Sequence, residues 1–365
     1  MRVLIAIDKF KESLTSIQAS TIIQAGILKK QPSYKTTILP MADGGDGFAS
    51  TLKFYLDTKT VYVNSVDSLN KPMKGYYEWS SSNKIAIIEL AVCSGLATIS
   101  DKERNPLKTS TYGTGILIKH AIKKGARKII LGLGGSATND AGMGIACALG
   151  FQFFDKKDQE LAPIGGSLNK IAMIKQPLKM PKINFEIAAD VTNPLYGKNG
   201  AAYVYSPQKG ANKSQVELLD KGLRNFASVI KSSTNKDISK IQSLGAAGGV
   251  AAMLVPYFPS SISSGFELIV KMSKLKSYLK KTDLLITGEG KIDSQSFQGK
   301  VVGTLLNYIK GSKIKVLLIA GIMENKHKTL TSGYSIIELA DKNISKEYSI
   351  KNAKKILKKK IESYF

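Results

Sequence analysis

Residues 132–144 read Gly132-Leu133-Gly134-Gly135-Ser136-Ala137-Thr138-Asn139-Asp140-Ala141-Gly142-Met143-Gly144, a glycine-rich stretch that carries hydroxyl, amide and carboxylate side chains. The apolar run Ile129-Ile130-Leu131 comes directly before it and predicts a buried strand. Glycine lets backbone N–H groups approach an anion closely. The stretch therefore indicates a phosphate-binding turn at the end of a strand.

Other short aliphatic runs also end at an acid or a glycine. They cover residues 3–7, 187–189, 284–287 and 316–320. Continuous apolar strands are typical of a mostly parallel sheet with helices on both faces. Ligands bind at the carboxyl ends of the strands in such sheets, which is where these acids and glycines lie.

The length of 365 residues exceeds the ~250–300 residues at which single hydrophobic cores stop growing, so we expect two domains. Residues 61–90 alternate in a way that predicts an antiparallel meander, unlike the rest of the chain. We expect a discontinuous first α/β domain at 1–60 and 264–365, and an inserted second α/β domain at 61–263. The predicted helices are 15–30, 46–56, 114–124, 138–149, 214–231, 266–280, 299–310 and 349–362.

The net charge of +25 raises the question of nucleic-acid binding. All but four of the 53 basic residues are lysines spread along the whole chain, whereas base recognition relies on the arginine fork. We therefore expect a small-molecule substrate and no nucleic acid, and a non-catalytic nucleic-acid binder that uses the +25 charge is an alternative. No apolar run approaches the ~18 residues of a spanning helix, and Cys93 and Cys147 lack metal or redox spacing, so we expect a cytoplasmic protein without a membrane segment.

The turn at Gly132 also fits a GxGxxA pattern, and Asp155 lies near the position of a ribose-binding acid. A nicotinamide-dependent dehydrogenase is therefore the alternative function, and a purely structural turn is a further alternative. The polar start Thr138-Asn139-Asp140 argues against a dinucleotide fold, whose helix begins with apolar residues. No GxxxxGK[ST] motif is present, which excludes a Walker-type ATPase.

Carboxylates follow several of the predicted strands. Asp43 and Asp46 lie in a glycine-rich loop, where they could hold Mg²⁺ or form a plain Asp-Gly turn with a helix cap. Asp190 follows the 187–189 strand, and Glu289 and Asp293 follow the 284–287 strand. With few histidines in the chain, a carboxylate is the better candidate for the general base.

Hydroxyl and basic groups complete the candidate site. Ser110 and Thr111 come just before the helix predicted at 114–124, where N–H and hydroxyl groups favour an anion. Arg104 and Asn105 lie just upstream, and an arginine is suited to a bidentate grip on a carboxylate. Lys9 follows the first strand and could counter phosphate charge.

The chain resembles the type I glycerate kinases, a bacterial family that phosphorylates D-glycerate with ATP and Mg²⁺. The matching segments are 6–15, 40–47, 94–96, 104–107, 111–115, 131–144, 193–195, 207–211, 246–249 and 287–290, together with Glu89, Asp190 and Asp293. One departure is Ser243-Leu244-Gly245, where the family usually has Gly-Ala-Gly. The resemblance implies two different α/β domains with the active site in the cleft between them.

We therefore expect ATP-dependent phosphorylation of D-glycerate, with 2-phosphoglycerate as the expected product and homo-oligomerisation left open. From the residues themselves we assign Asp190, Lys9 and Asp43 to catalysis. The expected substrate contacts are Arg104, Asn105, Ser110 and Thr111. The expected nucleotide contacts are Gly134, Gly135, Ser136, Thr138, Asn139, Asp140, Gly288, Glu289 and Gly290. The expected Mg²⁺ ligands are Asp43, Asp46 and Asp293.

Overall fold

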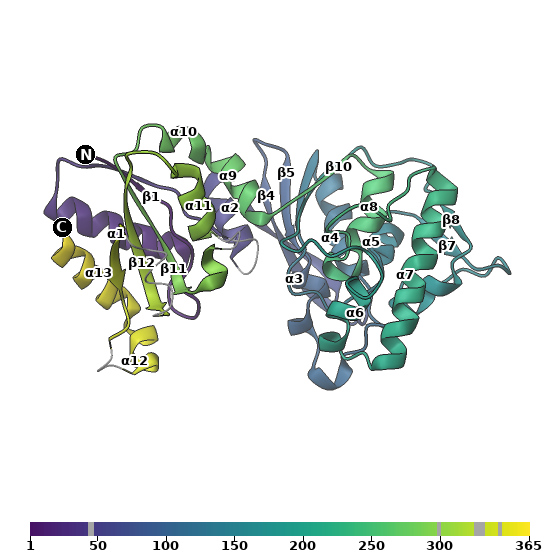
Figure 1. Cartoon of the computed structure of the whole chain (residues 1–365). Helices are drawn as coiled ribbons and strands as arrows, with labels where there is room; N and C mark the ends of the chain where they lie inside the picture. The colour runs from purple at the N-terminus through teal and green to yellow at the C-terminus, as the bar shows by residue number, and fades with distance from the viewer. Residues whose placement is uncertain (43–46, 298–300, 325–332, 342–344) are drawn as a thin grey trace. The chain divides into compact units, whose positions relative to one another are not determined.

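A computed structural model describes residues 1–42, 47–297, 301–324, 333–341 and 345–365. Contacts within the chain divide it into two compact units (Figure 1). Unit 1 comprises Met1–Asp43, Ser50–Tyr55 and Gly265–Phe365, and unit 2 comprises Gly44–Ala49 and Leu56–Ser264. The domain boundaries expected from the sequence stay a prediction.

Unit 1 is built on a parallel five-stranded sheet with the order β13-β12-β11-β1-β2. Its strands are β1 (Arg2–Ile5), β2 (Lys35–Ile38), β11 (Leu284–Ile292), β12 (Lys315–Met323) and β13 (Ser335–Glu338). From β1, the chain adds β2 on one side of the sheet. It later adds β11, β12 and β13 in turn on the other side. The strand order therefore reverses between β1 and β11, which is where doubly wound sheets bind ligands.

Helices α1 (Ser16–Lys30) and α13 (Ala353–Tyr364) lie side by side on one face of this sheet (Figure 1). A Cβ atom on Gly26 would lie 2.7 Å from Cγ2 of Ile361, so the two helices pack closely there. Val3 and Ile5 face these helices, while Leu4 between them is also buried, because successive side chains of a strand alternate. The parallel pairing of all five strands confirms the predicted parallel sheet, and the burial of both faces of β1 agrees with it. The other helices of unit 1 are α2 (Phe48–Leu56), which continues into unit 2 at its ends, α9 (Gly265–Ser273), α10 (Leu275–Leu279), α11 (Val301–Ile309) and α12 (Lys346–Lys351).

Unit 2 is built on a six-stranded sheet with the order β10-β9-β6-β5-β4-β3. Its strands are β3 (Lys59–Val66), β4 (Pro72–Ser80), β5 (Ile85–Glu89), β6 (Lys128–Gly132), β9 (Asn184–Ala188) and β10 (Ser260–Ser263). Strands β3 to β5 form the predicted antiparallel meander, and the remaining neighbours pair in parallel. A small antiparallel pair, β7 (Gln152–Phe154) and β8 (Met173–Lys175), stands apart from this sheet.

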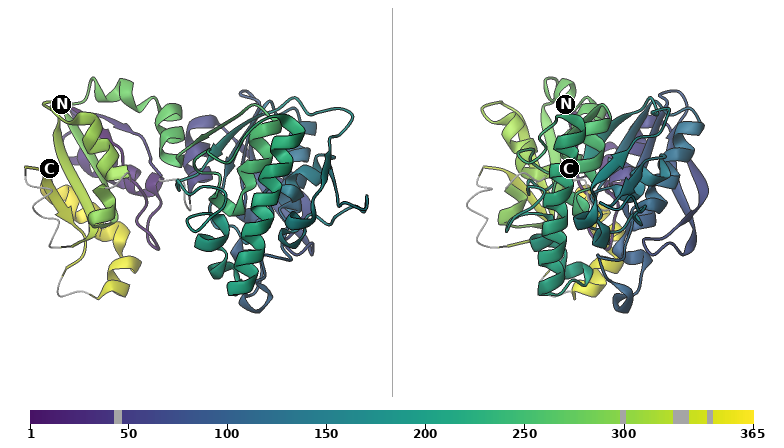
Figure 2. Two further views of the ribbon diagram at one scale, coloured as in Figure 1. Left: turned by 45° about the vertical axis from the view of Figure 1, so that its right-hand side comes forward. Right: turned by 90° about the vertical axis from the view of Figure 1, so that its right-hand side faces the viewer.

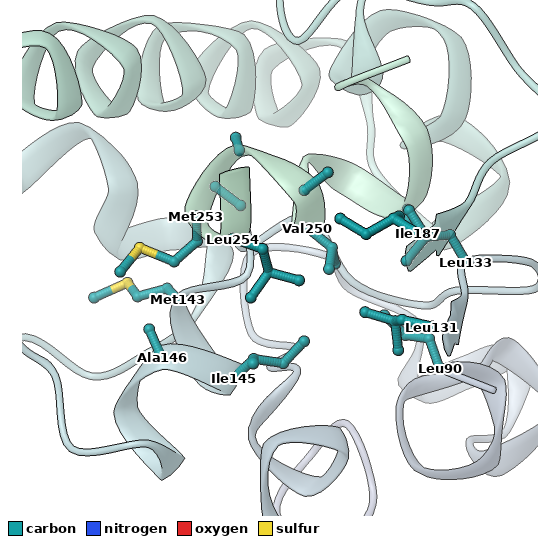
Figure 3. Packing of buried hydrophobic residues seen from close by; sticks show 14 of the residues in the cluster. Leu90, Leu131, Leu133, Met143, Ile145, Ala146, Ile187, Val250, Met253 and Leu254 are labelled. Carbon is teal, nitrogen blue, oxygen red and sulfur yellow. The ribbon is translucent and has the colours of Figure 1, made fainter. Parts of the chain in front are cut away.

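The helices of unit 2 enclose one large apolar core. They are α3 (Ala91–Ser94), α4 (Tyr112–Lys123), α5 (Met143–Ala148), α6 (Ala201–Tyr205), α7 (Lys213–Thr234) and α8 (Val250–Tyr257). Figure 2 shows the long helix α7 at the surface of this unit. Residues Met143 and Ile145 of α5 lie opposite Met253 and Leu254 of α8, next to Leu131 of β6 (Figure 3). The segment that joins β6 to α5 is therefore held at both ends by core packing.

Several details differ from the sequence-based predictions. The helix predicted at 138–149 begins only at Met143, because the positive φ angles of Ala141 (53°) and Gly142 (78°) keep the preceding residues in a turn. Gly288-Glu289-Gly290 lies inside β11 rather than after it. A Cβ atom on Gly288 would lie 1.8 Å from the carbonyl oxygen of Ile319, so the missing side chain lets β11 and β12 continue side by side.

The predicted helix 266–280 is divided into α9 and α10 at Lys274, which has a φ of 54°. Within the described residues, no helix is both long and apolar enough to cross a membrane.

Candidate active site

The glycine-rich turn follows β6, the strand of the unit 2 sheet that lies between β5 and β9. The N–H of Leu90 donates to Gly132 O at 2.9 Å, and the N–H of Leu133 donates to Ala188 O at 3.2 Å. Gly134 and Gly135 are exposed, whereas residues 136–140 are buried. Only the tip of the turn is therefore open to a ligand.

The N–H groups at this tip are available for binding. Across the ranges that the structure describes, no hydrogen bond uses the N–H of Gly134, Gly135 or Ser136. The carbonyl of Gly135 accepts from Leu96 N at 2.9 Å, and φ of Gly135 is +69°. Consecutive free N–H groups beside a left-handed residue form a concave anion-binding surface. The geometry suits the predicted phosphate cradle, and the identity of its ligand stays a prediction.

A buried lysine lies directly behind the tip. Lys209 ends the short helix η4 (Pro207–Lys209) and is only 2% exposed. Its Nζ donates to Ser136 Oγ at 2.8 Å and to the carbonyl oxygen of Thr138 at 2.7 Å. Burial lowers the pKa of Lys209 to about 7, and the charge of Asp140 opposes this shift. The sequence reasoning did not select Lys209 as a site residue.

Two further segments hold the buried part of the turn. Ser206 Oγ donates to Asn139 Oδ1 at 3.1 Å. On the other side, Gly248 O accepts from Ala141 N at 3.1 Å, and a Cβ atom on Gly248 would lie 2.2 Å from Thr138 O. Within the described chain, Thr138 Oγ1 and Asn139 Nδ2 are buried without a hydrogen-bond partner. Such groups are costly unless a water or a ligand satisfies them.

Asp140 is fully buried and binds to the protein itself. Its Oδ2 accepts from Thr111 N at 2.7 Å, Thr111 Oγ1 at 2.8 Å and Gly144 N at 3.1 Å, and its Oδ1 accepts from Gly142 N at 3.2 Å. Burial raises the pKa of Asp140, and these hydrogen bonds oppose the shift by favouring the ionised form. The geometry favours a structural role that joins the N-terminal ends of α4 and α5. Its predicted contact with a nucleotide stays a prediction.

The predicted substrate residues differ in how many of their side-chain groups are already hydrogen-bonded within the protein. Thr111 is fully buried, and its Oγ1 both donates to Asp140 and accepts from Ile145 N at 3.0 Å. Ser110 is also fully buried, and its Oγ accepts from Tyr112 N at 3.2 Å. The side chain of Asn105 accepts from Leu107 N at 3.0 Å. The side chains of Thr111, Ser110 and Asn105 are therefore already engaged in hydrogen bonds within the protein.

Arg104 keeps binding capacity. Its Nη2 lies 2.6 Å from Oδ1 of Asp101, while its buried Nε has no hydrogen-bond partner in the described part of the chain. A Cβ atom on Gly210 would lie 2.2 Å from Arg104 O, so the backbone of Arg104 packs directly beside the residue that follows Lys209. The fold therefore places Arg104 next to the segment that supports the turn.

Asp190 lies at the same edge of the sheet as the turn. Gly132 pairs with Ala188, so Gly134 and Asp190 each come two residues after paired positions on neighbouring parallel strands. Asp190 is exposed, unlike Asp140. Its carboxylate therefore has the accessibility that a general base needs.

The remaining predicted residues belong to unit 1. Asp8, which the sequence reasoning did not select, is 5% exposed; its Oδ1 accepts from Lys9 N at 2.7 Å, and its own N–H donates to Gly288 O at 3.0 Å. Lys9 and the Gly288-Glu289-Gly290 run thus meet where the strand order reverses. In this described part of unit 1, Thr287 Oγ1 is buried without a hydrogen-bond partner.

The predicted metal ligands are only partly described. Asp293 Oδ1 accepts from Ser296 N at 3.3 Å, and its Oδ2 lies 3.4 Å from Lys291 Nζ. Asp43 and Asp46 lie outside the described residues. Within the described ranges, no three His, Cys, Asp or Glu side chains form a group that could hold a metal ion.

Free N–H groups at an exposed tip, with a buried lysine behind them on an α/β scaffold, suit the positioning of a phosphoryl group, and the class of protein that this arrangement fits is the phosphotransferases. The family model of the glycerate kinase family matches residues 3–365, and the chain belongs to this family. The comparisons give no support to the dehydrogenase alternative.

Individual relatives agree with the family match. The glycerate kinase of Halalkalibacterium halodurans is 38% identical over 322 residues, which cover 87% of this chain and 85% of the relative. The glycerate 2-kinase of Escherichia coli K12 is 36% identical over 324 residues, covering 88% and 85%. The crystal structure of a protein described as glycerate kinase 2 from Salmonella typhimurium LT2 superposes with a TM-score of 0.88 at 34% identity, covering 100% of this chain and 97% of that chain.

The first prediction concerns Asp140. Asp140→Asn replaces a carboxylate oxygen by an NH₂ group that cannot accept from Thr111 or the glycine N–H groups, and should lower the free energy of unfolding by roughly 2–4 kcal/mol. Urea denaturation measures this loss. Asp158→Asn, at an exposed turn residue, is the matched control and should stay near wild type. Equal stability of the two variants would contradict the structural role of Asp140.

The second prediction concerns pH. The pKa of Lys209 falls from 10.5 to about 7 on burial, so the unfolded state binds more protons than the folded state between these values. The stability of the wild type relative to Lys209→Met should therefore rise with pH from 7 to 10, by on the order of 1 kcal/mol per pH unit.

Urea denaturation at pH 7, 8 and 9 tests this pH dependence. Lys213→Met removes an exposed lysine and is the control, for which the difference from wild type should not change with pH. A pH-independent difference for Lys209→Met as well would show that Lys209 does not titrate in this range.

Proposed function

We propose that this enzyme catalyses the ATP-dependent phosphorylation of D-glycerate to 2-phosphoglycerate. The observation that carries the proposal is the exposed tip of the glycine-rich turn, whose free N–H groups lie in front of the buried Lys209. Membership of the glycerate kinase family and the name of the Escherichia coli relative, a glycerate 2-kinase, support the acceptor and the position of transfer. The substrates are small molecules, and we propose no nucleic-acid partner.

The proposed nucleotide contacts in unit 2 follow the geometry of the turn. The N–H groups of Gly134, Gly135 and Ser136 donate to phosphate oxygens, because they are free donors at and beside the exposed tip of the turn. The buried Thr138 Oγ1 and Asn139 Nδ2 supply further donors behind the tip. In unit 1, we propose that Gly288, Glu289 and Gly290 also contact the nucleotide. Lys9, beside Asp8, balances the charge of the transferring group.

The proposed acceptor contacts use Arg104 and Asp190. The guanidinium of Arg104 holds the glycerate carboxylate, because a planar fork matches a carboxylate geometrically. The Asp190 carboxylate orients the acceptor hydroxyl and receives its proton as the phosphoryl group arrives. Catalysis then consists of positioning and electrostatic stabilisation, as is usual in phosphoryl transfer. We propose that Asn105, Ser110 and Thr111 line the acceptor site beside Arg104, and Thr111 also holds the turn through its hydrogen bonds to Asp140.

We propose Mg²⁺ as the metal ion. Mg²⁺ commonly uses one or two carboxylates together with waters and substrate phosphates, so it does not require a complete protein cage. The carboxylate of Asp293 at the end of β11 fits this mode, and Asp43 and Asp46 are the further proposed ligands. When bound, the ion neutralises phosphate charge.

We also propose the two-domain organisation with boundaries near 60 and 264, and a cytoplasmic location. The cysteines support a reducing compartment, since Cys93 and Cys147 are both free thiols. Burial raises the pKa of Cys147 to about 12, which keeps this thiol protonated and unreactive.

The third prediction tests the reaction and its position. Incubation with ATP, Mg²⁺ and D-glycerate should yield ADP and 2-phosphoglycerate, whose phosphorus NMR signal distinguishes it from the 3-isomer. A reaction without D-glycerate is the control for ATP hydrolysis. The absence of any phosphoglycerate signal would overturn the proposed reaction, and a signal of the 3-isomer would correct the position.

The fourth prediction tests the proposed base. Asp190→Asn should lower kcat by ~10²-fold or more, because the amide cannot accept the hydroxyl proton. The stability should stay close to that of the wild type, since Asp190 is exposed. Steady-state kinetics and urea denaturation measure the two quantities, and Asp158→Asn is again the control. A variant with near-normal turnover would remove Asp190 from this role.

A further inference from the structure

Lys209 differs from the other lysines by where it lies. The chain has 53 basic residues, yet Lys209 is the one among the largest fully buried side chains of the described structure. A buried lysine costs free energy that an exposed one does not. Exposed lysines keep a protein soluble, but a buried lysine cannot do so. The burial of Lys209 therefore points to a different role.

The hydrogen bonds of Lys209 hold the buried side of the turn. Ser136 Oγ and Thr138 O, its two acceptors, belong to the first three buried residues after the exposed tip. The free N–H groups of residues 134–136 lie on the same short segment. The position of Lys209 Nζ consequently fixes the conformation in which these donors are presented.

The hydrogen-bonding capacity of Lys209 is matched to the neutral amine. An ammonium group carries three N–H donors, and only two acceptors are found within the described chain. Burial moves the pKa of Lys209 to about 7. Asp140 is the carboxylate that acts on Lys209 from the turn, and Arg104 is the cation of the segment packed against Gly210. Near neutral pH, the group is therefore poised between its two protonation states.

We infer that Lys209 is a positioning residue that couples the binding of a phosphate group at the Gly134–Gly135 tip to the uptake of a proton. A phosphate anion at the tip favours the ammonium form, and the ammonium form in turn strengthens binding of the anion through Ser136 and the turn. This inference rests on the proposed function, in which the tip holds nucleotide phosphates. A carboxylate is also an anion, so D-glycerate at this tip is the alternative source of the same effect.

The first test uses the wild-type enzyme. Calorimetric titration with MgADP at pH 8, in buffers of different ionisation enthalpy, should show an uptake approaching one proton per ADP. The affinity for ADP should fall by up to about tenfold per pH unit above pH 8. D-Glycerate alone should bind without this uptake. Binding of ADP without proton uptake would overturn the inference, and uptake with D-glycerate instead of ADP would overturn the assignment to phosphate.

The second test uses variants. Lys209→Met should weaken ADP binding by about tenfold or more and abolish both the proton uptake and the pH dependence. Lys209→Arg retains a permanent charge and should bind ADP without proton uptake. Lys213→Met, an exposed lysine at the start of α7, should match the wild type. Circular dichroism confirms folding of each variant.

The two proposals can fail separately. Wild-type affinity and proton uptake in a folded Lys209→Met variant would overturn the role of Lys209. The calorimetric readouts need no turnover, so they are independent of whether glycerate is phosphorylated. A wild type that takes up a proton with ADP but forms no phosphoglycerate would contradict the proposed function and leave the coupling at Lys209 standing.

Discussion

The buried carboxylate of Asp140 is the interaction on which the rest of the site depends. A carboxylate is expensive to remove from water, and here four hydrogen bonds from Thr111, Gly142 and Gly144 offset that cost. The donors belong to the beginnings of α4 and α5, where the helix dipoles favour negative charge. One side chain thus fixes two helices against each other and fixes the start of α5. The turn before α5 has its shape because both of its ends are fixed, one by β6 and one by Asp140.

Much of the fold was predictable because its signals are local. Continuous apolar runs predicted the central parallel strands, and alternation predicted the β3 to β5 meander. The start of α5 was not predictable, because the positive φ of Ala141 depends on the contact of Ala141 N with Gly248, about a hundred residues away. The extension of β11 through Gly288 likewise depends on the neighbouring backbone of Ile319.

The candidate site was predicted at the ends of strands, and which of its residues contact a ligand stays a prediction. The polar run Thr138-Asn139-Asp140 was predicted to begin a helix and to face a ligand, whereas the structure buries it in a turn before α5. Sequence cannot tell a carboxylate that faces a ligand from one that faces the fold. Lys209 was missed for a related reason: in a chain with this many lysines, nothing local marks the one that the tertiary structure buries. The resemblance did include the 207–211 segment, so the signal was present as a motif and lacked a physical interpretation.

The absence of side chains at the tip of the turn has a consequence for how this enzyme could change. Gly134 and Gly135 present only backbone, and a side chain on Gly248 would displace the carbonyl of Thr138, so the anion cradle leaves little room for adaptation by substitution. In the proposed assignment the acceptor binds elsewhere, so new acceptor alcohols would be accommodated in the more exposed segment around Arg104 and Asn105. In a laboratory evolution experiment that selects for a new acceptor, we expect the sequence of the turn to stay unchanged. Substitutions should accumulate instead in residues 101–108.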